Sequence, residues 1–280
     1  MNNNSNNSTL PNTVKNTAPV TLSSLQKQKA LKEKTTCLTA YDASFARVAG
    51  EAGVDLLLIG DSLGMVLQGN TSTLPVSIEH MVYHTECVAR GRVRSMIMSD
   101  LPFLSTVSEI QCLDWAGKLM QAGAEIVKLE GGQWATSYVE QLKRCGIPVC
   151  VHLGLTPQYV HQFGGYKVQG KKLDAAQRLI EDAQVLENSG ADMLLLECIP
   201  ISVTEKIMNA VHIPVIGIGA GKLTDGQILV MHDLLGVSPP PHARFVENFL
   251  TNQNSIHAAI AAYVDAVRNQ TYPTDAQSFH

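Results

Sequence analysis

Three stretches of similar pattern decide the fold: 52–61 (AGVDLLLIGD), 122–130 (AGAEIVKLE) and 189–197 (SGADMLLLE). Each one has a small residue and a glycine, then an acid, an apolar run and a second acid. Glycine is favoured where a helix ends in the left-handed conformation. A near-continuous apolar run is typical of a strand that is covered on both faces of a parallel sheet. Each stretch therefore predicts a helix end followed by a buried parallel strand.

Runs of this kind recur along the chain from residue 35 onward. We predict strands at 35–39, 54–59, 94–99, 124–129, 147–151, 192–196, 213–218 and, from the faintest pattern, 228–231. Helical patterns separate them, most clearly at 77–91, 107–122 and 174–189. Repeated strand-then-helix order favours parallel units. Eight such units predict a closed (β/α)8 TIM barrel, with an open doubly wound sheet as the alternative.

Length and composition fit one large domain. The chain has 280 residues, of which 45% are hydrophobic and 16% charged, so apolar material suffices for a sizeable core. The first twenty residues are rich in Asn, Ser and Thr and carry few large apolar side chains. Such a segment buries too little surface to offset its ordering entropy. We expect a disordered tail over 1–20 and a single barrel catalytic domain over 21–280.

The charge balance argues against several classes of partner. The formal net charge is −4 and no stretch is strongly basic, so we expect neither nucleic acid nor a membrane as a partner. No apolar run approaches the roughly 20 residues that span a bilayer. The six cysteines lack metal-ligand spacing, which is typical of buried reduced thiols and favours a cytoplasmic location. A small molecule is the expected partner.

Polar residues gather where the predicted strands end, which is where barrel enzymes place their catalytic groups. In chain order they are Tyr41, Asp42, Asp61, Ser62, Asp100, Lys128, Glu130, His152 and Glu197. One acid in such a place is readily explained as a helix N-cap. Acids at several strand ends instead converge on one mouth of a closed barrel and repel one another. A hard divalent ion such as Mg²⁺ would relieve that repulsion.

Lys128 and Glu130 share one face of their strand, because side chains alternate along a strand. With Val127 and Leu129 turned towards the helices, both charged residues point into the barrel. A buried ammonium is costly unless it is paired. Two interpretations stay open and are compatible: an internal Lys128–Glu130 ion pair, and a cation that binds a substrate carboxylate or oxo group while Glu130 serves a metal.

Glu197 and His152 each allow two interpretations. Glu197 should point inward with Leu195 from an otherwise apolar strand, which suits proton abstraction, although a further metal ligand is the alternative. His152 stands at the end of its predicted strand, and is either a substrate contact or a structural histidine.

Two glycine-rich segments follow strands on the same side of the predicted barrel. Residues 217–221 (GIGAG) lie where many barrels bind phosphate, and a tight turn explains them equally well. Residues 163–170 (FGGYKVQG) have glycines around a polar and aromatic tip. That pattern is typical of a loop that closes over a site, with an ordinary surface loop as the alternative.

Several long motifs resemble those of the ketopantoate hydroxymethyltransferases. They are 59–65 (IGDSLGM), 99–103 (SDLPF), 127–132 (VKLEGG), 152–158 (HLGLTPQ), 163–170 (FGGYKVQG), 196–198 (LEC) and 216–221 (IGIGAG). The likeness runs from about Leu22 to His280. It departs locally at 239–243 (PPPHA), away from the strand-end acids.

This resemblance implies a Mg²⁺-dependent (β/α)8 barrel of the pyruvate/phosphoenolpyruvate group. Such enzymes transfer a hydroxymethyl group from 5,10-methylenetetrahydrofolate to 3-methyl-2-oxobutanoate, giving ketopantoate (2-dehydropantoate) for pantothenate biosynthesis. Bacterial members are often decamers, so the resemblance also implies a homo-oligomer, with a homodecamer as one form of it.

The resemblance also implies roles for single residues. Asp61 and Asp100 become metal ligands, and Glu130 supports the metal directly or through water. Glu197 becomes the group that accepts a proton from the substrate. Substrate contacts are implied or expected for a set that overlaps the metal ligands, namely Asp61, Ser62, Asp100, Lys128 and His152.

Two rival functions are weighed against this transferase. The first is a carbon–carbon lyase of the same barrel group acting on an oxo-acid. Such lyases commonly use a cysteine on a mobile loop, and Cys198 beside Glu197 should face away from the site. The second is a barrel without catalysis that binds oxo-acids or serves as a scaffold. An inward Lys128, Glu130 and Glu197 argue against it, because binding alone does not require a buried base.

Overall fold

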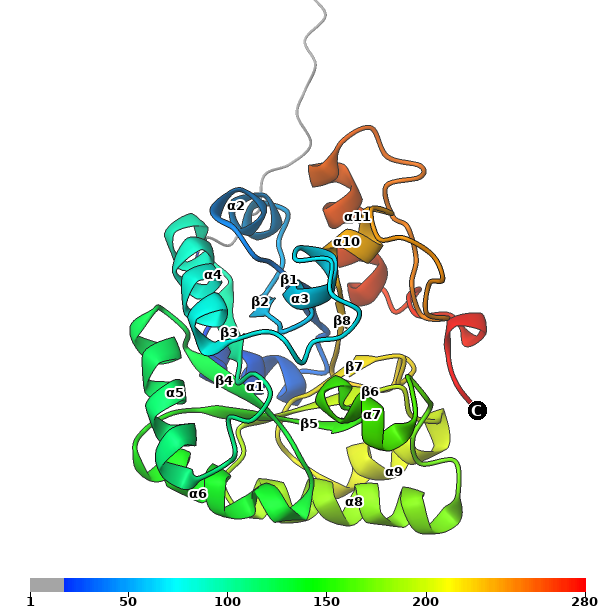
Figure 1. Cartoon of the computed structure of the whole chain (residues 1–280). Coiled ribbons are helices and arrows are strands. Elements are labelled where there is room, and N and C mark those ends of the chain that lie inside the picture. Colours follow the sequence, from blue (N-terminus) through cyan, green and yellow to red (C-terminus); the bar gives the residue numbers. More distant parts are fainter. Residues whose placement is uncertain (1–17) are drawn as a thin grey trace, which may run out of the picture.

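The computed structural model describes residues 18–280, and its eight strands close into one parallel barrel in chain order (Figure 1). Each strand pairs with the next, and β1 pairs with β8. The strands are β1 (Thr35–Thr39), β2 (Leu56–Ile59), β3 (Met96–Asp100), β4 (Ile126–Glu130), β5 (Val149–Gly154), β6 (Met193–Glu197), β7 (Val215–Ile218) and β8 (Gly226–Leu229). The predicted barrel is confirmed, and the open sheet is excluded.

Six of the eight predicted strand starts are shifted by two residues. The strand expected at 54–59 begins only at Leu56, and Asp55 just before it accepts the Thr36 N–H of β1 with its side chain. The strand expected at 228–231 is β8, which begins two residues earlier, at Gly226. A Cβ at Gly226 would lie 2.3 Å from the Thr35 carbonyl oxygen, so glycine permits this close pairing with β1. Met231 instead begins a helix, and its N–H donates to Thr39 Oγ1.

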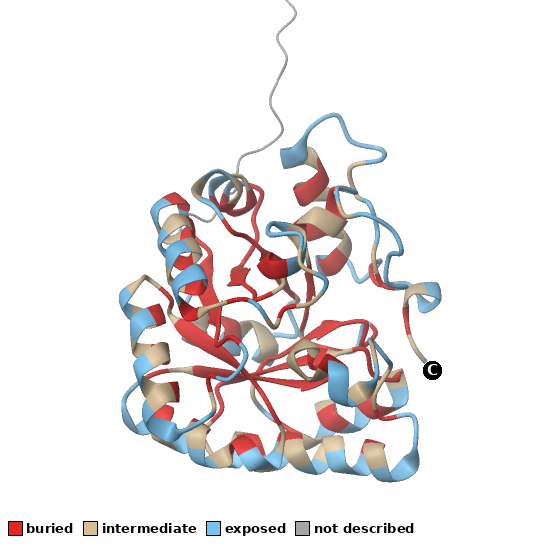
Figure 2. Cartoon of the chain, viewed as in Figure 1, coloured by how far each residue is buried: buried red, intermediate tan, exposed pale blue. Residues whose placement is uncertain are grey.

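Helices surround the ring of strands, which is mostly buried, and the helices carry the exposed residues on their outer sides (Figures 1 and 2). The long ones after the strands are α2 (Ala43–Glu51), α4 (Ile78–Gly91), α5 (Glu109–Gln121), α6 (Thr136–Arg144), α8 (Leu173–Asn188), α9 (Ile201–Ala210) and α11 (Ile256–Arg268). Helices predicted at 77–91, 107–122 and 174–189 are confirmed within two residues. Short helices α3 (Leu63–Val66), α7 (Val160–Phe163) and α10 (Met231–Leu234) lie in the loops after β2, β5 and β8. Within residues 18–280 no helix combines the length and apolarity needed to cross a membrane.

The three repeats form the predicted turn from helix to strand. Their glycines, Gly53, Gly123 and Gly190, have φ values of 98°, 113° and 102°. A side chain at these positions would be strained, so the glycines allow α2, α5 and α8 to end sharply before the next strand begins. The left-handed glycines predicted from the repeats are confirmed.

An acid precedes every even-numbered strand and ties it to the strand before it. Its carboxylate accepts a hydrogen bond from a backbone N–H at or next to the start of that previous strand. The pairs are Asp55 with Thr36, Glu125 with Ile97, Asp192 with Val149 and Asp225 with Val215, at 2.9–3.1 Å between oxygen and nitrogen. The first acid of each sequence repeat therefore has a structural role at the N-terminal end of the barrel.

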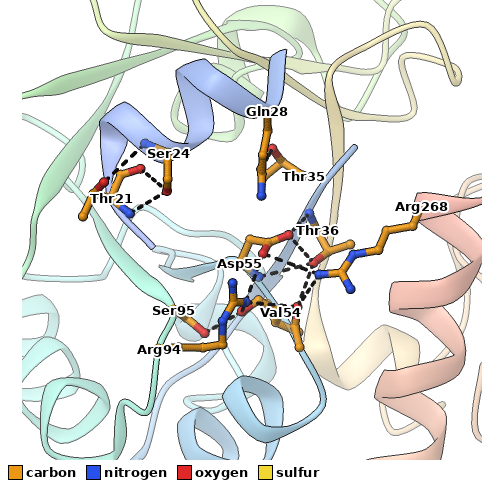
Figure 3. A network of polar contacts seen from close by, with 11 residues as sticks. Thr21, Ser24, Gln28, Thr35, Thr36, Val54, Asp55, Arg94, Ser95 and Arg268 are labelled. Atoms are coloured by element: carbon orange, nitrogen blue, oxygen red, sulfur yellow. Dashed lines mark hydrogen bonds and ion pairs between the residues drawn. The ribbon is translucent and has the colours of Figure 1, made fainter. Parts of the chain in front are cut away.

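Each of these acids also has a basic partner. The ion pairs are Asp55–Arg94 (3.0 Å), Glu125–Arg92 (2.6 Å), Asp192–Lys143 (2.6 Å) and Asp225–Lys29 (2.8 Å). Asp55 is the most deeply buried acid of the four, and Figure 3 shows it between Arg94 and Arg268. Charges at this end of the barrel are therefore compensated one by one.

Helix α1 (Leu22–Ala30) packs against the N-terminal end of the barrel. Its Leu25 is fully buried, and Gln28 accepts a hydrogen bond from the Thr35 hydroxyl (2.8 Å). Val20 falls within the tail expected at 1–20, but it is buried and donates its N–H to the Arg94 carbonyl. The packed chain therefore includes Val20, and residues 1–17 of the expected tail lie outside the described residues.

Candidate active site

A cavity of about 160 Å³ lies at the C-terminal ends of the strands. It is lined by all of the predicted site residues, namely Asp61, Ser62, Asp100, Lys128, Glu130, His152 and Glu197. Apolar side chains complete its wall, among them Leu58, Leu195 and Phe245. The barrel therefore brings seven residues from β3 to β6 and the loop after β2 to one small space.

Lys128 lies at the centre of the charged group. Its Nζ is 2.6 Å from Asp100 Oδ1 and 3.5 Å from Glu130 Oε1. The predicted Lys128–Glu130 contact is present, but Asp100 is the closer partner. In the parallel ladder Asp100 of β3 stands directly beside Lys128 of β4, a neighbour that spacing along one strand does not reveal.

Burial and mutual repulsion shift the ionisation of this group. Burial, reinforced by the charge of Glu130, raises the pKa of Asp61 to about 6. Burial also raises the pKa of Asp100 and of Glu130, while the neighbouring Lys128 opposes both shifts. Burial by itself would lower the pKa of Lys128, but the charges of Asp100, Glu130 and Asp61 outweigh it and raise that pKa. Three carboxylates thus share one ammonium, and the group has an excess of negative charge when all are ionised.

The donor set fits a hard divalent cation. Within residues 18–280 no three His, Cys, Asp or Glu side chains form a ready-made coordination group. Mg²⁺, however, is commonly held by one or two carboxylates and completes its shell with waters and substrate oxygens. Glu130 Oε1 is buried and has no hydrogen-bond partner among residues 18–280, and such an oxygen is stabilised by a cation. Carboxylate oxygens that no protein cation neutralises are suitable ligands for Mg²⁺.

Gln158 was given no role by the sequence, although it closes one of the quoted motifs. It belongs to the 3-10 turn η2 (Pro157–Tyr159) that follows β5. Its Nε2 donates to Asp61 Oδ2 (2.9 Å) and to the Leu101 carbonyl (3.0 Å), and its backbone N–H donates to Glu130 Oε2 (3.0 Å). A polar residue in the loop after a strand end was the available signal, and only the fold shows its partners.

Glu197 is the last residue of β6 and stands apart from the ion-paired group. Its side chain is 17% exposed, whereas those of Asp100, Lys128 and Glu130 are 1–4% exposed. A Cβ at Gly154, whose φ is 93°, would lie 2.2 Å from the Glu197 carbonyl oxygen. Glycine at the end of β5 therefore lets the end of β6 approach closely. The chain then turns at Cys198, which is buried, has a φ of 48° and does not line the cavity.

His152 lies between the two kinds of carboxylate. Its Nδ1 is 3.3 Å from Glu130 Oε1 and its Nε2 is 3.4 Å from Glu197 Oε2, but neither contact has hydrogen-bond geometry. Burial, helped by the positive charge of Lys128, lowers the pKa of His152 and favours the neutral ring. A neutral imidazole has one N–H and one acceptor nitrogen, so it can donate to only one of the two acids. Its role towards substrate stays a prediction.

The polar residues that follow β1 and β2 have different roles. Asp42 caps helix α2, because its Oδ1 accepts the N–H groups of Ser44 (2.8 Å) and Phe45 (3.0 Å). The N-cap explanation therefore holds for Asp42, which does not line the cavity. Ser62 does line it, and its hydroxyl lies 2.9 Å from that of Tyr41.

The two glycine-rich segments also differ. Tyr166, at the tip of residues 163–170, lines the cavity, and its hydroxyl contacts Met65 Sδ of α3 (3.4 Å). In residues 217–221, Gly219 has a φ of 61°, and a Cβ there would lie 2.7 Å from the Phe245 ring. Packing against Phe245 favours the tight-turn interpretation of that segment. Three further polar residues of the cavity wall had no predicted role: Thr39, Thr73 and Asp233.

Comparison with known proteins agrees with this geometry. The sequence model of the family "Ketopantoate hydroxymethyltransferase" matches residues 19–275. The chain is 56% identical over 260 residues to a 3-methyl-2-oxobutanoate hydroxymethyltransferase of Chromohalobacter salexigens, covering 93% of this chain and 99% of the relative. A protein of the same name from Marinomonas sp. is 54% identical over 263 residues, covering 94% and 96%. Among solved structures, 2,3-dimethylmalate lyase has a TM-score of 0.56 at 14% identity, covering 90% of this chain and 98% of that one, which shows the fold alone.

Proposed function

The chain belongs to the ketopantoate hydroxymethyltransferase family, and on that premise we propose that it converts 3-methyl-2-oxobutanoate to ketopantoate, with 5,10-methylenetetrahydrofolate as the one-carbon donor. Methylene transfer with uptake of one water gives the hydroxymethyl product and tetrahydrofolate. The observation that carries the proposal is one small cavity in which a buried Lys128 faces acids while Glu197 stands apart from them. A cation and a separate base are what enolisation of an oxo-acid requires.

The charged group would bind and polarise the oxo-acid. Asp61 and Asp100 would hold Mg²⁺, with Glu130 supporting it directly or through water. When bound, Mg²⁺ would act as a Lewis acid towards the keto oxygen of the substrate. Lys128 adds a positive charge beside the same oxygens, and Ser62 offers a hydroxyl for a hydrogen bond. Because this cluster is almost fully buried, its charges act with little screening by water.

Glu197 would remove the proton from C3 of the substrate. The electron pair of that C–H bond moves towards the keto group, where Lys128 stabilises the developing negative charge. C3 then forms its new bond to the one-carbon unit of the folate, the two bonds from that carbon to the folate nitrogens break, water supplies the hydroxyl group, and the nitrogens take up the two protons released. Glu197 suits this task because no Lys or Arg within residues 18–280 pairs with its carboxylate, which lies 3.4 Å from His152 Nε2. A base placed in this way contributes about 10²–10⁴-fold to the rate.

The decisive measurement is hydrogen–deuterium exchange at C3 of 3-methyl-2-oxobutanoate, with Mg²⁺ present and folate absent. We expect exchange in the native enzyme and its loss with EDTA or in Glu197→Gln. Exchange at the full rate in Glu197→Gln would remove Glu197 as the base. No exchange in the native enzyme, even with folate added, would refute the enolate mechanism.

The carbon–carbon lyase is the second candidate, and the position of Cys198 argues against it. Lyases of the same barrel group commonly act through a cysteine on a mobile loop. Cys198 is buried and does not line the cavity. The assay that separates the two activities is release of a smaller oxo-acid from a branched hydroxy-acid, which we expect the enzyme not to catalyse.

Cellular setting and assembly are further parts of the proposal. All six cysteines are free in the structure, which fits a reducing compartment such as the cytoplasm. The family resemblance supports a homo-oligomer, with a homodecamer as the form to test. Sedimentation of the purified protein distinguishes a decamer from smaller assemblies.

A further inference from the structure

Gln158 contacts two of the three carboxylates around the proposed cation position, Asp61 and Glu130, and it reaches them from a different loop. We propose that Gln158 is a positioning residue that fixes the orientation of Asp61 and Glu130 for the divalent ion. This inference rests on the proposed function, in which those two acids serve Mg²⁺. Gln158 would orient these carboxylates without contacting the reacting atoms.

The side-chain amide of Gln158 has one possible orientation. Its two contacts, Asp61 Oδ2 at 2.9 Å and the Leu101 carbonyl at 3.0 Å, are both hydrogen-bond acceptors. Only the NH₂ group can satisfy them, because a flipped amide would place its own oxygen against two other oxygens. Since one of the two N–H bonds is fixed by the backbone of Leu101, the other holds Asp61 Oδ2 in a set direction. Rotation of the Asp61 carboxylate would break this bond.

The backbone of Gln158 performs the same task for Glu130. Its N–H donates to Glu130 Oε2 at 3.0 Å, whereas Oε1 of the same carboxylate is buried without a hydrogen-bond partner. That free oxygen faces Lys128 Nζ at 3.5 Å and His152 Nδ1 at 3.3 Å. One residue of η2 thus occupies one oxygen of each acid, and leaves Glu130 Oε1 for a cation.

A purely structural role fits these contacts less well. Gln158 is only partly buried, and its side-chain hydrogen bonds go to Asp61 and to the Leu101 carbonyl. The bond to the Leu101 carbonyl adds little to the position of the loop, because the Leu101 N–H already donates to the Lys128 carbonyl. Residues that orient metal ligands typically change metal affinity by about 10–100-fold when replaced. The same magnitude is expected for Gln158.

The test is direct binding of Mn²⁺ to the metal-free, full-length enzyme, followed by electron paramagnetic resonance of the unbound ion. Gln158→Leu keeps the side-chain size and the backbone N–H but removes both amide hydrogen bonds. We expect its Mn²⁺ dissociation constant to rise about 10-fold or more, while its unfolding midpoint stays within about 3 °C of the native value. Gln158→Asn, whose amide is too short for both acceptors, provides a second variant if Gln158→Leu does not fold.

The matched control is Gln162→Leu. Gln162 is an exposed glutamine on α7, four residues further along, and it does not line the cavity. Native binding in Gln162→Leu and weakened binding in Gln158→Leu support the inference. Equal Mn²⁺ binding by the native enzyme and Gln158→Leu overturns the inference alone. Absence of Mn²⁺ binding in the native enzyme overturns the proposed metal site and this inference together.

Discussion

At the N-terminal end of the barrel, Asp55, Glu125, Asp192 and Asp225 each have a basic partner and a backbone N–H. At the C-terminal end, Asp61, Asp100 and Glu130 share Lys128 as their cation, and Glu130 Oε1 has no hydrogen-bond partner in the part of the chain that the structure describes. Both ends place carboxylates beside the ends of strands, and β2 and β4 have such an acid at each end. Only at the C-terminal end do the carboxylates outnumber the basic side chains that pair with them.

This difference separates two uses of buried charge. Acids that are fully hydrogen-bonded and paired tie neighbouring strands together and need nothing further. Acids that are short of partners cost stability, and natural proteins retain such groups chiefly where a ligand completes them. Each sequence repeat contains one acid of each kind, before and after the same strand. We therefore expect substitutions at the two ends to separate stability from catalysis.

Glu197→Gln should give the largest effect, and at the catalytic end only. Without its base, kcat should fall by about 10²–10⁴-fold, which corresponds to roughly 3–5 kcal/mol in the activation barrier. Because no Lys or Arg in the described part of the chain pairs with Glu197, the unfolding free energy of the enzyme should change by less than about 1 kcal/mol in Glu197→Gln. Steady-state kinetics and urea unfolding of the same preparation test this. If Glu197→Gln lowered the unfolding free energy as much as a substitution at the N-terminal end, the distinction between the two ends would be removed.

Asp55→Ala should give the opposite result. It leaves Arg94, whose side chain is 9% exposed, without its carboxylate, and frees the Thr36 N–H. Breaking a buried pair in this way costs about 3–5 kcal/mol. The measurement is the unfolding free energy in urea. The fraction that remains folded should keep the native KM for the oxo-acid, and a changed KM would argue that the two ends are coupled.

Asp192 allows the contribution of the ion pair with Lys143 to be separated from that of the hydrogen bond with the Val149 N–H. Asp192→Asn keeps an acceptor for the Val149 N–H and loses only the charge opposite Lys143, which is 51% exposed, so about 1 kcal/mol or less should be lost. Asp192→Ala loses the acceptor as well and should cost about 1–3 kcal/mol. Thermal unfolding of both variants checks the order. A larger loss in Asp192→Asn would show that charge, and not the hydrogen bond, dominates.

Lys118→Ala should give the smallest effect and serves as the reference. The Lys118–Asp114 pair on α5 is 2.8 Å long but about half exposed on both sides. Water and salt screen such pairs, so the unfolding free energy should change by about 0.5 kcal/mol or less. Activity should be native. A larger loss would mean that exposed ion pairs also stabilise the barrel, so the stabilising charges would not be confined to its N-terminal end.

Much of the fold and of the site could be predicted from local patterns. The repeats predicted strands and left-handed glycines, and the acids at strand ends predicted which side chains would share a mouth. Strand boundaries were less accurate, because residues such as Asp55 and Gly226 are selected by contacts with a neighbouring strand. Gln158 was missed for a similar reason, since its partners lie 97 and 28 residues away along the chain.

The sequence by itself determined the barrel, the inward direction of Lys128 and Glu130, and the family to which the chain belongs. These properties depend on period, on turn residues and on motifs that are local in the chain. Only the tertiary structure decided that Asp100 is the closest partner of Lys128, that His152 lies between two acids, and that Gln158 holds Asp61. Those contacts join residues of different strands and loops, and strand register and loop packing set them.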